Sequence, residues 1–334
     1  MSRKALALLS GGLDSTLAAK VLLEQGIEVE ALNFTSPFCT CTGKNAGCKS
    51  EALRVAQEFG IPIKVMNKGT DYLEIVRKPK HGYGSGMNPC IDCRIFLLRK
   101  AKEYMAESGA DFVFTGEVLG QRPMSQRRDA MRLIERESGL EGLLLRPLSA
   151  QHLPPTIPEK EGWVDREKLL AITGRSRKEQ MRLADELDIM NYPCPAGGCL
   201  LTEPSFVTKI RDVFDHSDEL DPRDFRLLKL GRHFRIGPRA KVIIGRNEAE
   251  NLSLENAAFP GEALMRWVEG SSPVGLFTGK VLPDMMETGA KILLRYTKAA
   301  PGAQCTLKTV ENGRESLFST ANTFNDTHTE KLRV

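Results

Sequence analysis

The stretch SGGLDST at residues 10–16 decides the fold of this chain. It lies between an apolar run at Ala5–Leu9 and a helical pattern at Thr16–Gln25, so a strand, a glycine turn and a helix meet there. The glycines let the backbone approach a ligand closely, and the unpartnered amides at the start of the helix favour an anion such as phosphate. The Gly-Lys-Ser/Thr ending of the common phosphate loop is missing, which excludes a Walker-type ATPase.

Short apolar runs alternate with helical patterns through the rest of the N-terminal half. The alternation predicts an α/β fold, with a parallel sheet flanked by helices on both faces and a ligand at the carboxyl ends of the strands. The predicted strands are Ile27–Phe34, Ile61–Met66, Asp111–Thr115 and Gly142–Arg146, and the predicted helices are Asn45–Phe59, Asn88–Ser108 and Met124–Glu137.

The pattern changes near residue 202, after a proline-rich loop and two short predicted helices. From Phe225 onward, short alternating segments such as Lys241–Gly245 and Lys291–Tyr296 are separated by glycine turns. We therefore expect two domains, at residues 1–202 and 203–334, of which the second is smaller and β-rich.

The bulk composition is that of a globular protein. The chain has 334 residues, of which 41% are hydrophobic and 27% charged, and its net charge is +4. No apolar run approaches the roughly 20 residues that span a bilayer, so we expect a cytoplasmic protein without a membrane partner. In such a protein, eight cysteines indicate metal or catalytic chemistry rather than disulfides.

Two segments pair cysteines closely: NPCIDCR at residues 88–94 and YPCPAGGC at residues 192–199. Cysteines three apart at a helix start face the same way, and the helix dipole there favours thiolates. Together the segments indicate an iron–sulfur or zinc site. A second metal could lie in the loop with Cys39, Cys41 and Cys48, with His81 as fourth ligand, although the spacing fits no zinc pattern; Cys305 is expected to be structural.

The SGGLDS segment resembles the SGGxDS loop of the PP-loop ATP pyrophosphatases. The resemblance implies an adenine nucleotide alpha hydrolase-like fold, in which this loop grips the pyrophosphate of ATP while a substrate oxygen is adenylated. Asp14 would assist with Mg²⁺ and act in catalysis. The nucleotide-binding residues implied in this half of the sheet are Ser10, Gly11, Gly12, Asp14, Ser15, Thr16 and Phe34.

Other segments resemble tRNA thiolation enzymes over residues 1 to about 202. The segment TGEVLGQ at residues 115–121, followed by Ser125-Gln126, is similar to one in bacterial tRNA 4-thiouridine synthetases that lies against the adenylate, which assigns Thr115, Gly116 and Gln121 to the nucleotide site. Arg146-Pro147-Leu148 also occurs there. We expect this chain to lack the N-terminal RNA-binding domain and the C-terminal rhodanese of that family.

The segment NPCIDC resembles tRNA 2-thiouridylases and, more closely, tRNA 2-thiocytidine synthetases. The latter resemblance implies a [4Fe–4S] cluster on Cys90, Cys93 and Cys194, with one iron left open for the sulfur to be transferred. Cys199 would be a fourth ligand or a catalytic persulfide carrier. The rival chemistry needs no cluster: one cysteine carries a persulfide and another resolves it as a disulfide.

The C-terminal half contains a basic stripe between Arg223 and Arg246, whose spacing suits phosphate contacts along RNA or, equally, a solvated charged face. The segment GRNEAEN at residues 245–251 resembles the GRNxxxN segment of the NFACT-R domain, an RNA-binding module. A second basic set lies in the first domain. The stripe includes Arg226, Lys229, Arg232, Arg235, Arg239 and Lys241, and the second set is Arg122, Arg127, Arg128, Arg132 and Arg136.

These features predict an ATP-dependent tRNA sulfurtransferase that adenylates a pyrimidine carbonyl and replaces its oxygen by sulfur. The expected partners are tRNA and a sulfur donor, either a cysteine desulfurase or sulfide, and a homodimer is compatible with the sequence. One alternative is a PP-loop enzyme that adenylates or sulfurates a small molecule. Another is a non-catalytic RNA-binding protein. The sequence does not identify the modified nucleoside.

Overall fold

The computed structural model describes residues 3–39, 48–192 and 199–334. The chain forms two compact units, Met1–Glu203 and Pro204–Val334. No helix among the described residues combines the length and the apolar character that a membrane span needs.

The first unit is built on a five-stranded sheet in which every neighbouring pair of strands is parallel. Its spatial order is β3-β2-β1-β4-β5. Because parallel strands are covered on both faces, their sequences are apolar almost throughout. The strands are β1 (Lys4–Leu8), β2 (Glu28–Thr35), β3 (Ile63–Asn67), β4 (Phe112–Thr115) and β5 (Leu144–Leu145).

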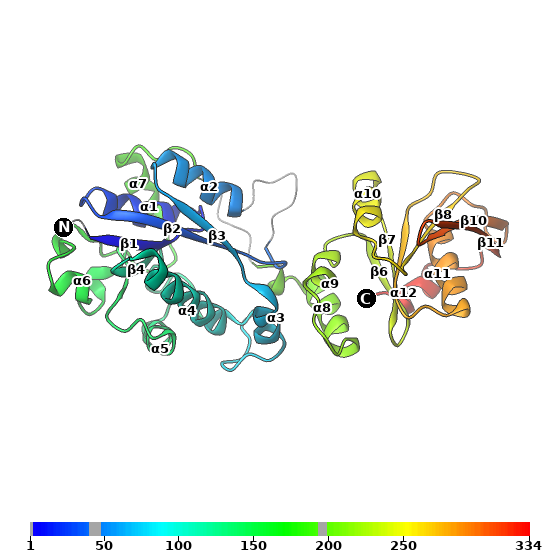
Figure 1. Ribbon diagram of the computed structural model, residues 1–334, viewed down its shortest axis with the longest axis horizontal. Coiled ribbons are helices and arrows are strands. Elements are labelled where there is room, and N and C mark those ends of the chain that lie inside the picture. The colour runs from blue at the N-terminus through cyan, green and yellow to red at the C-terminus, as the bar shows by residue number, and fades with distance from the viewer. Residues whose placement is uncertain (1–2, 40–47, 193–198) are drawn as a thin grey trace. The chain divides into compact units, whose positions relative to one another are not determined.

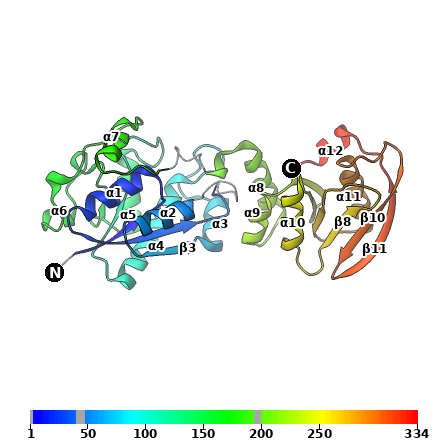
Figure 2. The same cartoon turned by 90° about the horizontal axis from the view of Figure 1, so that it is seen from above.

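Alternate residues of these strands pack into two cores, one on each face of the sheet. Ala5, Ala7 and Val29 face a core with α1 (Leu13–Leu23) and α7 (Lys178–Glu186), whereas Leu6 and Leu32 face α4 (Cys90–Ser108) and α5 (Arg128–Ser138). Figure 1 shows α1 and α7 above the strands and α4 and α5 below them, and Figure 2 gives the view from above. The remaining helices of this unit are α2 (Cys48–Glu58), α3 (Gly69–Arg77), α6 (Ile157–Lys160) and three short 3-10 helices, at Ala150–His152, Arg166–Lys168 and Leu200–Thr202.

The strand order creates a switch point beside β1. The chain runs from β1 to β2 and β3 on one side and then crosses to β4 on the other side of β1. The loops after β1 and β4 therefore leave the sheet in opposite directions and open a crevice between them, which is where open α/β sheets bind ligands.

The second unit is an antiparallel sheet of six strands in the order β11-β10-β8-β9-β7-β6, preceded by two helices. Its core packs one face of the sheet against α11, around Phe234, Phe277 and Leu293. The helices are α8 (Pro204–His216), α9 (Pro222–Leu227), α10 (Glu248–Ala257), α11 (Pro283–Arg295) and α12 (Asp326–Leu332). The strands are β6 (Arg232–Gly237), β7 (Ala240–Ile244), β8 (Ala263–Trp267), β9 (Gly275–Gly279), β10 (Gln304–Glu311) and β11 (Arg314–Ala321).

One predicted strand of this unit is wrong. Lys291–Tyr296 is not a strand but mostly the last turns of α11, which begins with Pro283 in its first turn. The buried residues Gly289, Ala290 and Leu293 continue the apolar pattern toward the N-terminus at helical spacing. A short apolar run does not distinguish a strand from the end of a buried helix, and only its extension does so.

Candidate active site at the sheet switch point

A cavity of about 270 Å³ occupies the crevice at the switch point of the first unit. Its walls come from the end of β1, the turn into α1, the segment after β4 and the starts of α4 and α7. The lining residues are Leu8, Ser10, Gly12, Leu13, Asp14, Ser15, Arg94, Thr115, Gly116, Glu117, Gln121, Arg122, Gln126 and Arg177.

The turn between β1 and α1 presents backbone amides to this cavity. Gly12 is the N-cap of α1. Because glycine has no side chain, it cannot accept a hydrogen bond from the backbone amides of the first turn. Ser15 lies in that turn, and its hydroxyl donates to the Gly12 carbonyl at 2.9 Å. Unpartnered amides and the positive end of the helix dipole together make an anion site.

Two glycines hold the turn in place by allowing close backbone contacts. Gly11 has φ +76°, and a Cβ there would lie 2.5 Å from the backbone nitrogen of Ala52 on α2. A Cβ at Gly116 would lie 2.5 Å from the carbonyl of Asp14 and the nitrogen of Ser15. The segment after β4 therefore packs directly on the β1–α1 turn, and the two halves of the cavity form a single unit.

The Asp14 carboxylate lies at the junction of these segments. Its Oδ2 accepts a hydrogen bond from Gln121 Nε2 at 3.1 Å. Its Oδ1 is buried and has no hydrogen-bond partner within the described residues. A buried carboxylate oxygen without a partner is costly in an isolated protein, so it indicates a cation or donor that arrives with a ligand.

Positive charge also lines the cavity, on Arg94, Arg122 and Arg177. The Arg94 guanidinium lies 3.3 Å from Glu117 Oε1, and Arg122 is held beside it by a hydrogen bond from its backbone nitrogen to Gln126 Oε1 at 2.9 Å. Burial, and then repulsion from Arg94, lower the pKa of Arg122. An anionic ligand would relieve this repulsion, so the charge distribution favours phosphates.

The structure separates the predicted nucleotide residues into two groups. Gly11, Thr16 and Phe34 do not line the cavity: Gly11 packs on α2, and the Thr16 hydroxyl donates to the Gly12 carbonyl at 3.2 Å. Arg94, Arg177 and Glu117 line it although the sequence reasoning did not assign them to it. The position of Arg94 directly after the second cysteine was the available signal. The predicted nucleotide-binding residues that do line the cavity are Ser10, Gly12, Asp14, Ser15, Thr115, Gly116 and Gln121.

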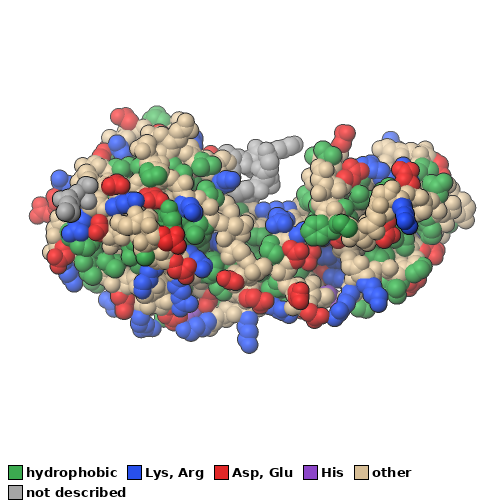
Figure 3. Space-filling view, viewed as in Figure 1, with side chains coloured by type: hydrophobic (Ala, Val, Ile, Leu, Met, Phe, Trp, Pro, Cys, Tyr) green, Lys and Arg blue, Asp and Glu red, His purple; other side chains and the backbone are tan. Residues whose placement is uncertain are grey.

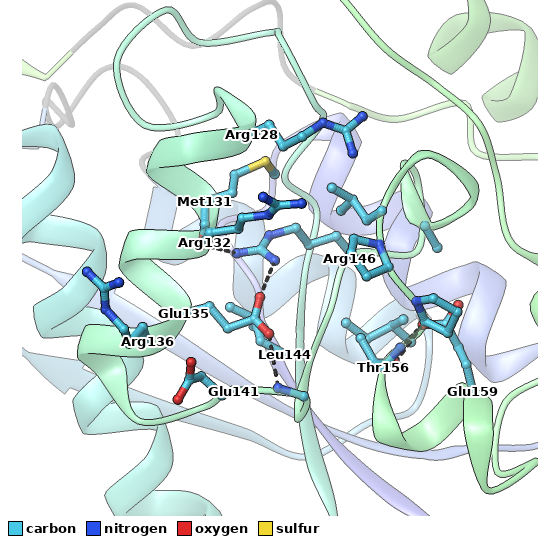
Figure 4. Close-up of a pocket in the computed structure, with 16 residues that line it drawn as sticks. Arg128, Met131, Arg132, Glu135, Arg136, Glu141, Leu144, Arg146, Thr156 and Glu159 are labelled. Atoms are coloured by element: carbon cyan, nitrogen blue, oxygen red, sulfur yellow. Dashed lines mark hydrogen bonds and ion pairs between the residues drawn. The ribbon is translucent and has the colours of Figure 1, made fainter.

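A chain of buried charges leads away from this cavity. Glu117 and Arg146, both 3% exposed, are joined at 3.2 Å, and Arg146 Nη1 lies 2.9 Å from Glu135 Oε2. Burial alone would raise the pKa of Glu117, but Arg94 and Arg146 lower it below its usual value. Figure 4 shows Arg146 and Arg132 pointing into a second cavity, of about 460 Å³, beside α5.

The cysteines of α4 lie in its first turn. Lys68 Nζ and the Tyr72 hydroxyl each donate a hydrogen bond to Cys93 Sγ at 3.2 Å. Burial opposes ionisation of Cys93, but Lys68 and the Tyr72 hydrogen bond outweigh it and lower its pKa. Burial and the neighbouring Cys93 raise the pKa of Cys90. The helix start thus pairs a thiol that ionises more readily than usual, Cys93, with one that ionises less readily, Cys90.

Cys199 approaches the same region from a distant part of the sequence. Its thiol donates to the Phe38 carbonyl at 3.5 Å, and burial raises its pKa to about 11. The Phe38 and Tyr72 ring centroids lie 6.1 Å apart, so this contact places Cys199 and Cys39 on the Phe38 side of Tyr72 and Cys93 at its hydroxyl. Burial and then Cys93 raise the pKa of Tyr72. Three separate segments therefore bring sulfur to one place.

The predicted metal ligands are described only in part. Cys194 and Cys41 lie outside the described residues, as does the side chain of Cys48. Among the residues that are described, no three Cys, His, Asp or Glu side chains are placed to hold a metal. His81, the predicted fourth ligand of the second metal, has its Nε2 at 3.2 Å from Glu137 Oε2.

The basic stripe of the C-terminal unit does not form a continuous surface. Arg223 is buried and pairs with Glu262, while Arg235 and Lys241 share Asp212. On the face shown in Figure 3, blue and red side chains are interspersed over this unit. The number of basic residues in the stripe therefore overestimates the unpaired positive charge on the surface of this unit.

Comparisons with known proteins agree with this organisation. Residues 1–152 match the family of the thiamine biosynthesis protein (ThiI), and residues 231–333 match the NFACT protein RNA binding domain. The chain thus combines a PP-loop domain like those of ThiI and MnmA with a C-terminal NFACT-type RNA-binding domain.

Individual relatives are distant. The tRNA-specific 2-thiouridylase MnmA of Listeria monocytogenes serotype 4a is 24% identical over 319 residues, which cover 86% of this chain and 81% of the relative. MnmA of Clostridium acetobutylicum is 34% identical over 131 residues, 35% of this chain and 36% of the relative. A crystal structure of a 4-thiouridine synthetase–RNA complex with bound ATP matches with a TM-score of 0.36 and 25% identity, covering 56% of this chain and 52% of that one.

Proposed function

We propose that this protein is a cytoplasmic ATP-dependent tRNA sulfurtransferase that makes a thiolated pyrimidine. The observation that carries the proposal is the cavity at the switch point, where the amides of the α1 turn, the Asp14 carboxylate and two arginines converge. The MnmA relatives are tRNA-specific 2-thiouridylases, and the match to the ThiI family, over residues 1–152, includes every cavity residue except Arg177.

In the first step, the cavity residues bind and orient ATP. The α1 amides, Arg94 and Arg122 hold the phosphates, and Asp14, whose Oδ1 lacks a partner among the described residues, would hold Mg²⁺. Mg²⁺ supplies charge neutralisation on the leaving pyrophosphate. The carbonyl oxygen of the base attacks the α-phosphorus and pyrophosphate leaves. The base oxygen is then part of a good leaving group, AMP.

In the second step, sulfur replaces that oxygen, and two carriers fit the chain. A [4Fe–4S] cluster would be held by Cys90, Cys93 and Cys194, and it would supply an open iron that binds the incoming sulfur. Cys90 and Cys93 lie together in the first turn of α4, and Cys194 lies outside the described residues.

The alternative carrier is a persulfide near Tyr72, on Cys199 or Cys93. Its terminal sulfur attacks the activated carbon, AMP leaves with the former base oxygen, and a carbon–sulfur bond forms. The other cysteine then attacks the inner sulfur, which releases the thiolated base and leaves a disulfide. A thiol reductant returns the disulfide to two thiols, and the persulfide of a cysteine desulfurase then transfers its outer sulfur to one of them. Sulfide serves without the reductant: it attacks the disulfide directly, which gives one persulfide and one thiol.

The decisive test compares Asp14→Ala with the wild type. The variant should keep the wild-type melting temperature and lose tRNA-dependent formation of AMP and pyrophosphate, because Asp14 supports the ligand rather than the core. If the folded variant still converts ATP to AMP, the nucleotide assignment is wrong. Nucleoside mass spectrometry of tRNA from a deletion strain should reveal a missing thiolated pyrimidine, and unchanged nucleosides would contradict the proposal.

A further inference from the structure

A groove of about 840 Å³ opens at one end of the C-terminal sheet. The register places Arg232 opposite Ile244, Ile244 opposite Gly275, and Gly275 opposite Met265, so four strands reach this end together. Its volume is in the range of ligand sites, about 300–1,000 Å³. The side chains that matter here are Arg232, Arg246, Arg266, Trp267, Tyr296 and Lys298.

The GRNEAEN segment builds one wall of the groove. Gly245 is required because a Cβ there would lie 2.1 Å from Asn251 Oδ1, which accepts a hydrogen bond from the Val274 nitrogen at 2.9 Å. Asn247 caps α10 by accepting from the Glu250 nitrogen at 3.0 Å. Both asparagines are therefore engaged in the architecture, and the exposed Arg246 guanidinium of the same segment pairs with Glu250.

The groove carries available positive charge. Within the described residues, neither Arg232 nor Lys298 has an acidic partner at ion-pair distance, and both line the groove. The groove has one acidic side chain, Glu248, in its walls, and its Arg246 and Arg266 pair with Glu250 and Glu255. A second cavity, of about 410 Å³ at the other end of β7 and β9, has four acidic side chains in its walls, and its Arg239 pairs with Asp218 at 2.7 Å. Phosphates are therefore favoured in the groove over the second cavity.

Aromatic rings lie among these cations. The Arg232 guanidinium stacks over Tyr296, 4.6 Å from the ring centroid, and Trp267 ends β8 partly exposed. A Cβ at Gly270 would lie 2.5 Å from the Trp267 ring, so the loop after β8 fixes this side chain at the groove. Aromatic rings and arginine planes bind bases by stacking, which requires bases whose faces are not covered by pairing.

We infer that this groove binds an unpaired segment of RNA, with bases on Trp267 and on the plane of the Arg232–Tyr296 pair, and phosphates on Lys298 and the N–H edge of Arg232. The inference rests on the proposed function only in naming tRNA as the source of that segment. A base-paired helix would offer the same phosphates without stackable bases and should bind more weakly.

Trp267 itself reports on the binding. The chain has two tryptophans, so Trp163→Phe in the full-length protein leaves Trp267 as the only indole. Unmodified tRNA should quench its fluorescence, whereas an RNA duplex of equal length should not. Fluorine NMR of the wild-type chain labelled with 5-fluorotryptophan gives the same readout without Trp163→Phe, and a Trp267→Phe sample assigns the resonance.

Variants then identify the contacts. Trp267→Leu should weaken tRNA binding about 5- to 100-fold by removing one stacked base. Joint replacement of Arg232 and Lys298 by alanine should also reduce the slope of log affinity against log salt by about 1.4, at roughly 0.7 for each lost phosphate contact. Arg239→Ala is the matched control, since it removes an exposed arginine from the other cavity, and it should bind like the wild type.

Three outcomes would overturn the inference: absence of tRNA binding, saturating binding with no change at Trp267, or an Arg239→Ala defect equal to that of the groove variants. Failure of the proposed function is distinguishable. Quenching by tRNA without AMP formation would leave the groove in place and refute the enzyme assignment, and tRNA-dependent AMP formation with a silent Trp267 would do the reverse.

Discussion

Replacing Gly116 by alanine tests whether the two sides of the nucleotide cavity are one unit. The added Cβ would lie 2.5 Å from three backbone atoms of Asp14 and Ser15, and ordinary contact begins at 3.4 Å, so the α1 turn must move by 0.9 Å (3.4 − 2.5). Overpacking of this kind costs about 1–3 kcal/mol. For a unit of this size, each kcal/mol lowers the melting temperature by about 2–4 °C, which gives a decrease of about 2–12 °C.

The larger effect should be on catalysis. A displacement near 1 Å at a reacting centre costs on the order of 100-fold in rate, so tRNA-dependent AMP formation should fall by about that factor in Gly116→Ala. Gly12→Ala is the control: Gly12 has φ −79°, and its Cβ would meet only Ser10 Oγ, at 3.5 Å. It should melt like the wild type yet bind ATP less well, because its methyl group enters the cavity. Wild-type melting and turnover in Gly116→Ala would refute the close packing of the two segments.

Three further predictions concern buried charges and cysteines. Arg146→Met should destabilise the first unit by about 3–5 kcal/mol in urea unfolding, because Glu117 loses a buried partner. The double variant with Glu117→Gln should recover part of this loss, and equal stability of the single and double variants would contradict the reasoning. The pKa of His233 is well below its usual value because burial and then Lys241 disfavour the charged ring, so only the unfolded state takes up a proton as the pH falls through about 6.5. Stability of the second unit should therefore decrease from about pH 7 to pH 5, and a flat profile would refute the burial argument. Anaerobically purified protein should be brown with near-equal iron and sulfide, and a serine at any proposed ligand should bleach it; a colourless preparation that thiolates tRNA at full rate would leave the persulfide carrier. The ligands to replace are Cys90, Cys93 and Cys194.

The first unit could be predicted from the sequence because its strands are apolar on both faces and its turns are glycine-rich. The parallel sheet and the α1 turn follow from such local signals. The strand order does not, because it depends on which faces the helices cover. That order brings the segment after β4 against Asp14, and it also brings Arg94 and Arg122 into the cavity from distant positions.

Charge and periodicity were less informative in the second unit. The basic stripe between Arg223 and Arg246 looks continuous in the sequence because its acidic partners, Asp212, Asp218 and Glu262, lie outside it. Similarly, Cys93 accepts a hydrogen bond from Tyr72 and Cys199 donates one to Phe38, which packs on Tyr72, and no spacing rule relates these two cysteines. Partners supplied by distant segments become visible only when the chain is folded.

The two asparagines of the GRNEAEN segment have a consequence for comparing relatives. Asn247 caps α10, and Asn251 accepts a hydrogen bond from the segment that enters β9. The same two asparagines in another chain therefore indicate the same fold at this point, but they do not indicate which ligand that fold binds. Ligand preference would vary instead at Arg232, Trp267 and Lys298, which are far from the motif in sequence. A relative that has the GRNEAEN-type motif but acidic or aliphatic residues at those three positions should fold in the same way and not bind RNA in this groove.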